Sequence, residues 1–252
     1  MRLKRRETLV LLTAVACTAL VGGMIYQRAR PRGERGLDTP AVWDAHSALA
    51  ALSAGNARFV SSHRTLSVDT AHDAELRHQT AREQHPFAAI LCCSDSRVCP
   101  EFIFDQRAGS FFEVRNAGNV VDEGVLGSFE YAVEHFHVPL MVVMAHKGCG
   151  AIHAVCEAGD NPLPDHLRDL QQHMSGIHQD IITAHHHDDP DVLDELSKKN
   201  AKQQAIAMLR DSRVLKTAVD KGEARLLYGI YDMDAGSVEF YDPQSNKLVS
   251  LP

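Results

Sequence analysis

The sequence predicts an α/β domain in which a central parallel four-stranded sheet with an antiparallel edge strand is flanked by helices. Two apolar runs, at residues 89–93 and 139–145, indicate buried strands, and each stops abruptly at residues that carry chemistry. Such runs are typical of parallel strands covered on both faces. A short turn at 234–236 joins the strands predicted at 225–231 and 237–241, which makes the last strand antiparallel.

Composition limits the class of protein. The 252 residues are enough for one sizeable domain with extensions. The formal net charge of −7 argues against a nucleic-acid partner, because such proteins usually carry a clustered basic excess. Four of the six cysteines lie in two short segments, 92–99 and 146–149, which suits metal binding better than a disulfide framework.

The first segment, residues 1–27, is expected to be a signal peptide or a signal anchor. Basic residues precede an uncharged apolar run at 8–25, which has about the 18-residue length of a minimal membrane span. Arg5-Arg6-x-x-Leu9 also resembles a twin-arginine export signal. We therefore expect export to the periplasm or cell envelope, with the membrane contacted only through this segment. Residues 28–41 are expected to be a linker, and residues 42–252 the folded domain.

Within the folded domain, apolar residues at steps of three and four indicate helices. We expect these over 42–60 and 75–83, from about 123, and as two long outer helices over 165–187 and 191–220. A strand at 111–115 leads into 116–119, where small residues suit a tight turn. Several histidines (166, 173, 178 and 185–187) fall in a mostly polar context and are expected on a solvated surface.

The strand at 89–93 ends at the first candidate site. Open α/β sheets place their chemistry just beyond the carboxyl ends of strands. If the chain is still extended there, side chains alternate between faces, so Cys93, Asp95 and Arg97 point one way. Cys92 and Ser94 point the other way. This alternation selects Cys93 as the thiol that faces the carboxylate and the guanidinium.

The strand at 139–145 ends in a second fragment, with His146 and Cys149 in His-x-x-Cys spacing. Together with Cys93 they form a Cys2His set, the ligand class of catalytic zinc sites that keep a fourth position open. Cys149 is expected near the start of a helix, where backbone N–H groups favour the thiolate. A structural thiol beside a satisfied histidine is the alternative, but it gives Asp95 and Arg97 no reason to lie in a dry crevice.

These fragments resemble a known family, the β-class carbonic anhydrases. Cys-Ser-Asp-Ser-Arg-Val at 93–98 and His-x-x-Cys-Gly-Ala at 146–151 are similar to its two zinc-binding signatures, and the likeness covers roughly residues 42–241. The resemblance implies a β-carbonic-anhydrase-like catalytic domain over 42–252 with one zinc ion per chain. It implies reversible hydration of carbon dioxide to bicarbonate and a proton by a zinc-bound hydroxide. It also implies a homodimer or a dimer of dimers, with the 42–60 helix packed on the neighbouring subunit or on its own sheet.

The resemblance also implies roles for the residues around the metal. Two thiolates leave zinc with a formal charge near zero, so neighbouring residues must compensate. Asp95 would orient the hydroxide, and Arg97 would hold Asp95 by a bidentate pair. If that pair breaks, as in some family members at lower pH, Asp95 could close the site. Gln106, Val98 and Phe104 are expected to line the substrate pocket.

Two other functions remain open at this point. A zinc hydrolase of the same fold that acts on carbon disulfide or carbonyl sulfide shares these motifs and would differ in pocket width. A zinc-binding or redox-sensing module would use Cys92, Cys93 and Cys99 as a thiol cluster, but it gives Asp95 and Arg97 no role.

Overall fold

A computed structural model of the protein describes residues 42–65, 74–177, 180 and 189–250. The chain divides into two compact units, Met1–Ala41 and Val42–Pro252, and all the described residues belong to the second. The signal segment and linker predicted over 1–41 lie outside the described residues. Among the described residues, none of the helices has the length and apolar character needed to cross a membrane.

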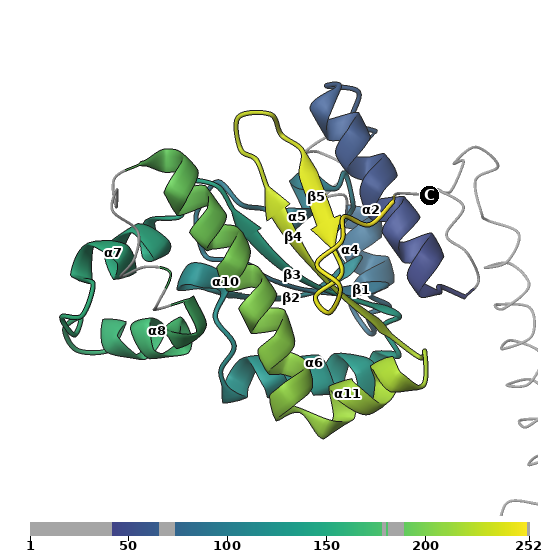
Figure 1. Ribbon diagram of the computed structural model, residues 1–252. Coiled ribbons are helices and arrows are strands. Elements are labelled where there is room, and N and C mark those ends of the chain that lie inside the picture. Colours follow the sequence, from purple (N-terminus) through teal and green to yellow (C-terminus); the bar gives the residue numbers. More distant parts are fainter. Residues whose placement is uncertain (1–41, 66–73, 178–179, 181–188, 251–252) are drawn as a thin grey trace, which may run out of the picture. The chain divides into compact units, whose positions relative to one another are not determined.

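The sheet of the described domain has five strands in the order β2-β1-β3-β4-β5 (Figure 1). The strands are β1 (Ala88–Cys93), β2 (Phe111–Asn116), β3 (Leu140–His146), β4 (Arg225–Tyr231) and β5 (Val238–Tyr241). The first four pair in parallel, and β5 pairs antiparallel with β4. The predicted parallel four-stranded sheet with an antiparallel edge strand is therefore confirmed.

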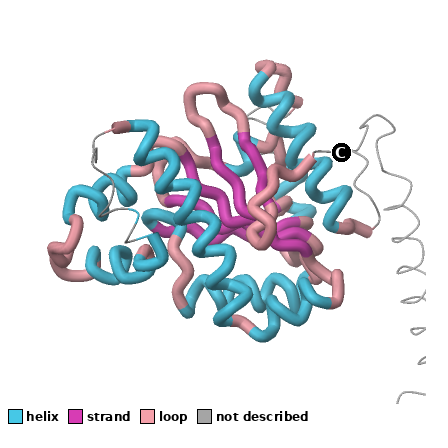
Figure 2. Tube along the Cα trace, viewed as in Figure 1, coloured by secondary structure: helices cyan, strands magenta, loops and turns pink. Residues whose placement is uncertain are grey.

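Helices cover both faces of this sheet (Figure 2). They are α2 (Ala45–Val60), α4 (Ala74–Thr80), α5 (Pro100–Ile103), α6 (Glu123–Phe136), α7 (Gly150–Ala158), α8 (Leu167–His173), α10 (Pro190–Asp211) and α11 (Arg213–Asp220), with 3-10 turns η1 (Ala117–Asn119) and η2 (Ser175–Ile177). On one face Leu91 packs in an apolar cluster with residues of α6, α10 and α11. Its neighbour Ile90 packs on the other face with residues of α2 and α5, as the period of two in a strand requires.

Helix α2 covers the sheet of its own chain at a close approach. A Cβ atom built on Gly55 would lie 1.7 Å from the carbonyl oxygen of Phe104, so only glycine fits there. The adjacent Asn56 amide donates to the carbonyls of Ile103 (3.2 Å) and Gly236 (2.8 Å) and accepts from the Val238 N–H (2.9 Å). These bonds hold α2 against α5 and the β4–β5 turn. Packing of α2 on a second copy of the chain stays a prediction.

The extent predicted for the two long outer helices is wrong. In the described part of 165–187, α8 ends at His173 and gives way to η2, while 178–179 and 181–188 lie outside the described residues. The segment 191–220 is broken at Ser212, whose backbone is extended (φ −115°, ψ 115°). The Ser212 hydroxyl accepts from the Leu215 N–H (3.1 Å) and so begins α11 as an N-cap. His166 and His173 are exposed, as expected; the other histidines of that group are outside the described residues.

The edge strand β2 carries a half-buried carboxyl group, Glu113. Its Oε1 atom has no hydrogen-bond partner among the described residues. Burial, and after it the nearby charge of Glu101, raises the pKa of Glu113 from its ordinary value of 4.5 to about 8. Between those two pH values the folded state keeps a proton that the unfolded state has lost. This group therefore makes the fold less stable as pH rises through that window.

Replacement of Glu113 by glutamine is expected to remove this pH-dependent loss. Above pH 8 the variant should be more stable than the wild type by on the order of 1 kcal/mol, a figure that allows for the partial exposure of the group. Urea unfolding at pH 6 and pH 9 measures the difference. Glu101→Gln is the control, because it removes the neighbouring charge and leaves the burial, so part of the slope should remain. Equal pH slopes for Glu113→Gln and the wild type would contradict the assignment.

Candidate metal centre

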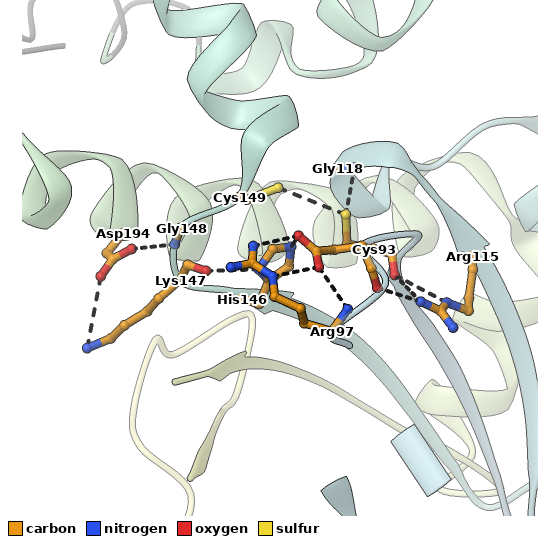
Figure 3. A network of polar contacts seen from close by, with 10 residues as sticks. Cys93, Arg97, Arg115, Gly118, His146, Lys147, Gly148, Cys149 and Asp194 are labelled. Atoms are coloured by element: carbon orange, nitrogen blue, oxygen red, sulfur yellow. Dashed lines mark hydrogen bonds and ion pairs between the residues drawn. The ribbon is translucent and has the colours of Figure 1, made fainter. Parts of the chain in front are cut away.

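The carboxyl ends of β1 and β3 are adjacent in the sheet, and they bring three predicted metal ligands together (Figure 3). Cys93 ends β1, His146 ends β3, and Cys149 is the N-cap of α7. The candidate ligand atoms of the three residues all lie within 4.8 Å of one another, and all three side chains are buried. The two Sγ atoms are 4.0 Å apart. The described chain therefore holds a Cys-His-Cys cluster that could bind a metal ion.

The histidine of this cluster presents an unused lone pair. Its Nδ1 lies 2.9 Å from the Lys147 carbonyl oxygen, and since a carbonyl can only accept, Nδ1 carries the proton. The Nε2 atom is then the acceptor, and it is buried without a hydrogen-bond partner among the described residues. Such an orphaned atom is costly unless something fills the position. One imidazole nitrogen and two thiolates are the donor set that zinc prefers, so the residues fit that metal.

The two thiols differ in acidity. The hydrogen bond between the two Sγ atoms lowers the pKa of Cys93 and raises the pKa of Cys149. The backbone N–H of Gly118, 3.4 Å from Cys93 Sγ, also stabilises the Cys93 thiolate. Because a metal requires both sulfur ligands as thiolates, a cation that binds here would release the thiol protons that remain.

Asp95 and Arg97 form the predicted bidentate pair beside this cluster. Arg97 Nε donates to Asp95 Oδ1 (3.0 Å), its Nη2 donates to Oδ2 (2.8 Å), and its backbone N–H donates to Oδ1 (2.9 Å). The guanidinium holds the pKa of Asp95 far below the ordinary range of a carboxyl group. Asp95 Oδ2 lies 3.9 Å from His146 Nε2. An ionised carboxylate is thus fixed next to the candidate ligands.

Cys93 and Cys92 lie in different clusters, as the predicted alternation of side chains requires. Cys93 packs with residues of α7 near the site, whereas Cys92 packs in the apolar cluster beneath α2 and α5. Cys99 Sγ donates to Glu101 Oε2 (3.5 Å). Cys92 and Cys93 thus belong to different clusters, which does not favour the single thiol cluster considered above.

The three residues expected to line a substrate pocket make contacts around α2 in this chain. Val98 and Phe104 are fully buried in the apolar cluster beneath α2, and Gln106 Nε2 donates to the Ala51 carbonyl (3.5 Å). A cavity of about 610 Å³ adjoins Cys149, but its lining contains none of the three. Their contact with substrate stays a prediction.

Two residues that were not predicted from the sequence, Arg115 and Asp194, hold the two ligand fragments in place. Arg115, at the end of β2, donates to the carbonyl oxygens of Cys93 (3.1 and 3.2 Å) and Asp95 (2.9 Å). Its position next to the carboxyl end of a predicted strand is the signal that could have found it. On the other fragment Asp194 accepts from the Gly148 N–H (2.9 Å), for which the sequence offers no signal.

The fold and the site together define a class: an α/β protein with a buried Cys-His-Cys cluster and an ion-paired aspartate at the carboxyl edge of its sheet. Residues 88–238 match the family described as carbonic anhydrase. Carbonic anhydrase 2 of Mycobacterium tuberculosis is 35% identical over 205 residues, which is 79% of this chain and 94% of that protein.

Solved structures agree with this match. The β-carbonic anhydrase CcaA superposes with a TM-score of 0.62 at 25% identity, covering 81% of this chain and 92% of that one. One of two tetrameric β-carbonic anhydrases of Sordaria macrospora shares the fold, with a TM-score of 0.58 at 22% identity over 71% of this chain and 96% of that one. The chain belongs to the β-class carbonic anhydrase family and is an enzyme of that class.

Proposed function

We propose that this chain catalyses the reversible hydration of carbon dioxide to bicarbonate and a proton, with one zinc ion per chain held by Cys93, His146 and Cys149. One observation carries the proposal. In a member of this family, two sulfur atoms and the unpartnered His146 Nε2 converge within 4.8 Å beside an ionised Asp95.

The residues around the cluster have separate tasks in this reaction. Zinc supplies, when bound, a positive centre that acidifies water toward neutral pH. Asp95 is in place to accept a hydrogen bond from the attacking water and so aim its lone pair at carbon dioxide. Arg97 keeps Asp95 ionised and off the metal position. The Lys147 carbonyl fixes the tautomer of His146, which leaves Nε2 free to coordinate.

Stopped-flow measurement of carbon dioxide hydration, with zinc assayed on the same sample of the full chain across pH, tests the proposal. We expect zinc near one per chain together with fast hydration. Full zinc occupancy without hydration at any pH would contradict the proposed reaction. Hydrolysis of carbonyl sulfide and carbon disulfide would then be assayed on that sample.

Replacement of Asp95 by asparagine is expected to lower kcat/KM for hydration by about 10²- to 10³-fold, the usual cost of losing one preorganised polar group at a reacting centre. Asparagine keeps the size of the side chain but loses the charge, and it leaves the Arg97 guanidinium unpaired. Zinc content should not change, because no ligand is altered. Asp211→Asn is the matched control, since it breaks a bidentate pair with Arg210 on the surface. An Asp95→Asn rate within twofold of the wild type would refute the role of Asp95.

We also propose that the protein is a homodimer or a dimer of dimers, and that it is exported through its first 27 residues. The tetrameric relatives support the first statement. The basic-then-apolar pattern of residues 2–25 supports the second. Light scattering on the purified protein and fractionation of the producing cells test them, and a monomer or a cytosolic pool would contradict them.

A further inference from the structure

A short turn beside the metal centre presents a backbone donor to one ligand. In η1, the N–H of Gly118 donates to Cys93 Sγ across 3.4 Å (Figure 3). Gly118 has a left-handed backbone (φ 72°), and the next residue, Asn119, is left-handed as well (φ 44°). The Asn116 side chain closes this turn locally, because it donates to the Val120 carbonyl oxygen (2.8 Å) and accepts from the Val120 N–H (2.9 Å). The carbonyl oxygen of Gly118 is held from outside the turn.

Helix α10 supplies that support through two buried amides. Asn200 Nδ2 donates to the Gly118 carbonyl oxygen (2.8 Å). Gln204 Nε2 donates to Asn200 Oδ1 (3.0 Å) and to the His173 carbonyl (2.8 Å), and Gln204 Oε1 accepts from the Val121 N–H (2.8 Å). Both residues are buried: Asn200 is 0% exposed and Gln204 is 3% exposed.

The two amides are costly to bury in α10, whose other buried residues are Leu196, Ser197, Ala201, Ala205 and Met208. Each amide loses its hydrogen bonds to water on burial, and only hydrogen bonds within the protein offset that loss. Here those bonds lead in one direction, from Gln204 to Asn200, from Asn200 to Gly118, and from Gly118 to Cys93. Gln204 in addition binds Val121, just beyond the turn. The network therefore contacts both the turn itself, at Gly118, and the chain just after it, at Val121.

We propose that Asn200 and Gln204 are positioning residues of the metal centre, which hold η1 so that the Gly118 N–H stays directed at Cys93 Sγ. This inference rests on the proposed zinc site. A backbone donor on a thiolate stabilises its charge and fixes the direction of its remaining lone pairs, so it selects the geometry that a metal requires. Without the amides the turn loses its hydrogen bonds to α10, and the Gly118 N–H is held toward Cys93 Sγ less firmly.

The test compares metal binding in the full chain carrying Asn200→Ala with that in the wild type. Competition of the zinc-loaded protein with a chromophoric chelator measures zinc affinity. We expect it to fall about 10- to 100-fold, the usual range for loss of a group that orients a metal ligand. In cobalt-substituted samples, the sulfur-to-cobalt charge-transfer absorption should also shift. Asn56→Ala is the matched control, because it deletes another buried, hydrogen-bonded amide, which holds α2 and not the turn.

Each outcome decides the proposal. Reduced zinc affinity and a shifted cobalt spectrum in Asn200→Ala, with neither change in Asn56→Ala, support it. Equal effects in the two variants would overturn it, because general destabilisation would then explain both. If Asn200→Ala does not fold, Gln204→Met decides, since it leaves the Asn200 donor present but without its hydrogen-bonded support. A wild type that binds no zinc would instead refute the proposed function itself.

Discussion

Replacing Cys93 with alanine is expected to leave the chain folded but nearly free of zinc, with less than about a tenth of a zinc ion per chain. Only one thiolate and one imidazole would remain, from Cys149 and His146, and two ligands do not hold a catalytic zinc ion. Hydration should fall to the uncatalysed rate, because the remaining polar groups have no acidified water to orient. Atomic absorption and stopped-flow assay on one sample measure both effects.

The neighbouring residue provides an unusually close control. Cys92→Ala also removes a thiol, one position earlier on the same strand. Cys92, however, is fully buried in the cluster on the other face of the sheet. It should keep zinc near one per chain and lose about 1–2 kcal/mol of stability to the small cavity. Zinc retained by Cys93→Ala, or lost equally by both variants, would show that the ligand assignment is wrong.

Gly55→Ala is expected to destabilise the fold by more than about 3 kcal/mol, at or beyond the upper end for overpacked sites. The new Cβ would lie 1.7 Å from the Phe104 carbonyl oxygen, which is backbone and cannot swing away. Helix α2 would have to move off the sheet. That shift would break the three hydrogen bonds of Asn56 and expose the apolar face around Leu52. Urea unfolding followed by circular dichroism measures the loss.

The same substitution in another helix should act in the opposite direction. Gly127 lies in α6 and is exposed, and a Cβ atom added to it would meet no other atom within 4 Å. Gly127→Ala is therefore expected to stabilise the protein by about 0.5–1 kcal/mol, because alanine restricts the unfolded chain. If Gly55→Ala costs less than about 1 kcal/mol, the close approach of α2 to Phe104 is not what fixes this helix.

The sheet and the ligands could be predicted because both depend on local pattern. Uninterrupted apolar runs locate β1 and β3, and the alternation of side chains separates Cys93 from Cys92. Parallel strands end at one edge, so the ligands on two distant segments could be placed together from the sequence alone.

The residues that support the site could not be predicted, because their roles depend on tertiary packing. Asn200 and Gln204 look in the sequence like ordinary polar positions of a helix, and only the position of α10 against η1 gives them partners. Ser212 interrupts a helical pattern that apolar periodicity continues through, because its hydroxyl caps the next helix. Periodicity reports which residues are buried, but not which hydrogen bonds each polar group finds.

The strand order has a consequence for how the protein is made. Cys93 leaves the ribosome at the end of β1, but its partners arrive only after β2 and α6 have been synthesised, because His146 ends β3 and Cys149 follows it in the sequence. Asn200 and Gln204 come later still, on α10. During synthesis the Cys93 thiol is therefore present before the other two ligands. A nascent chain stalled before β3 would expose this thiol to oxidants and to other metal ions.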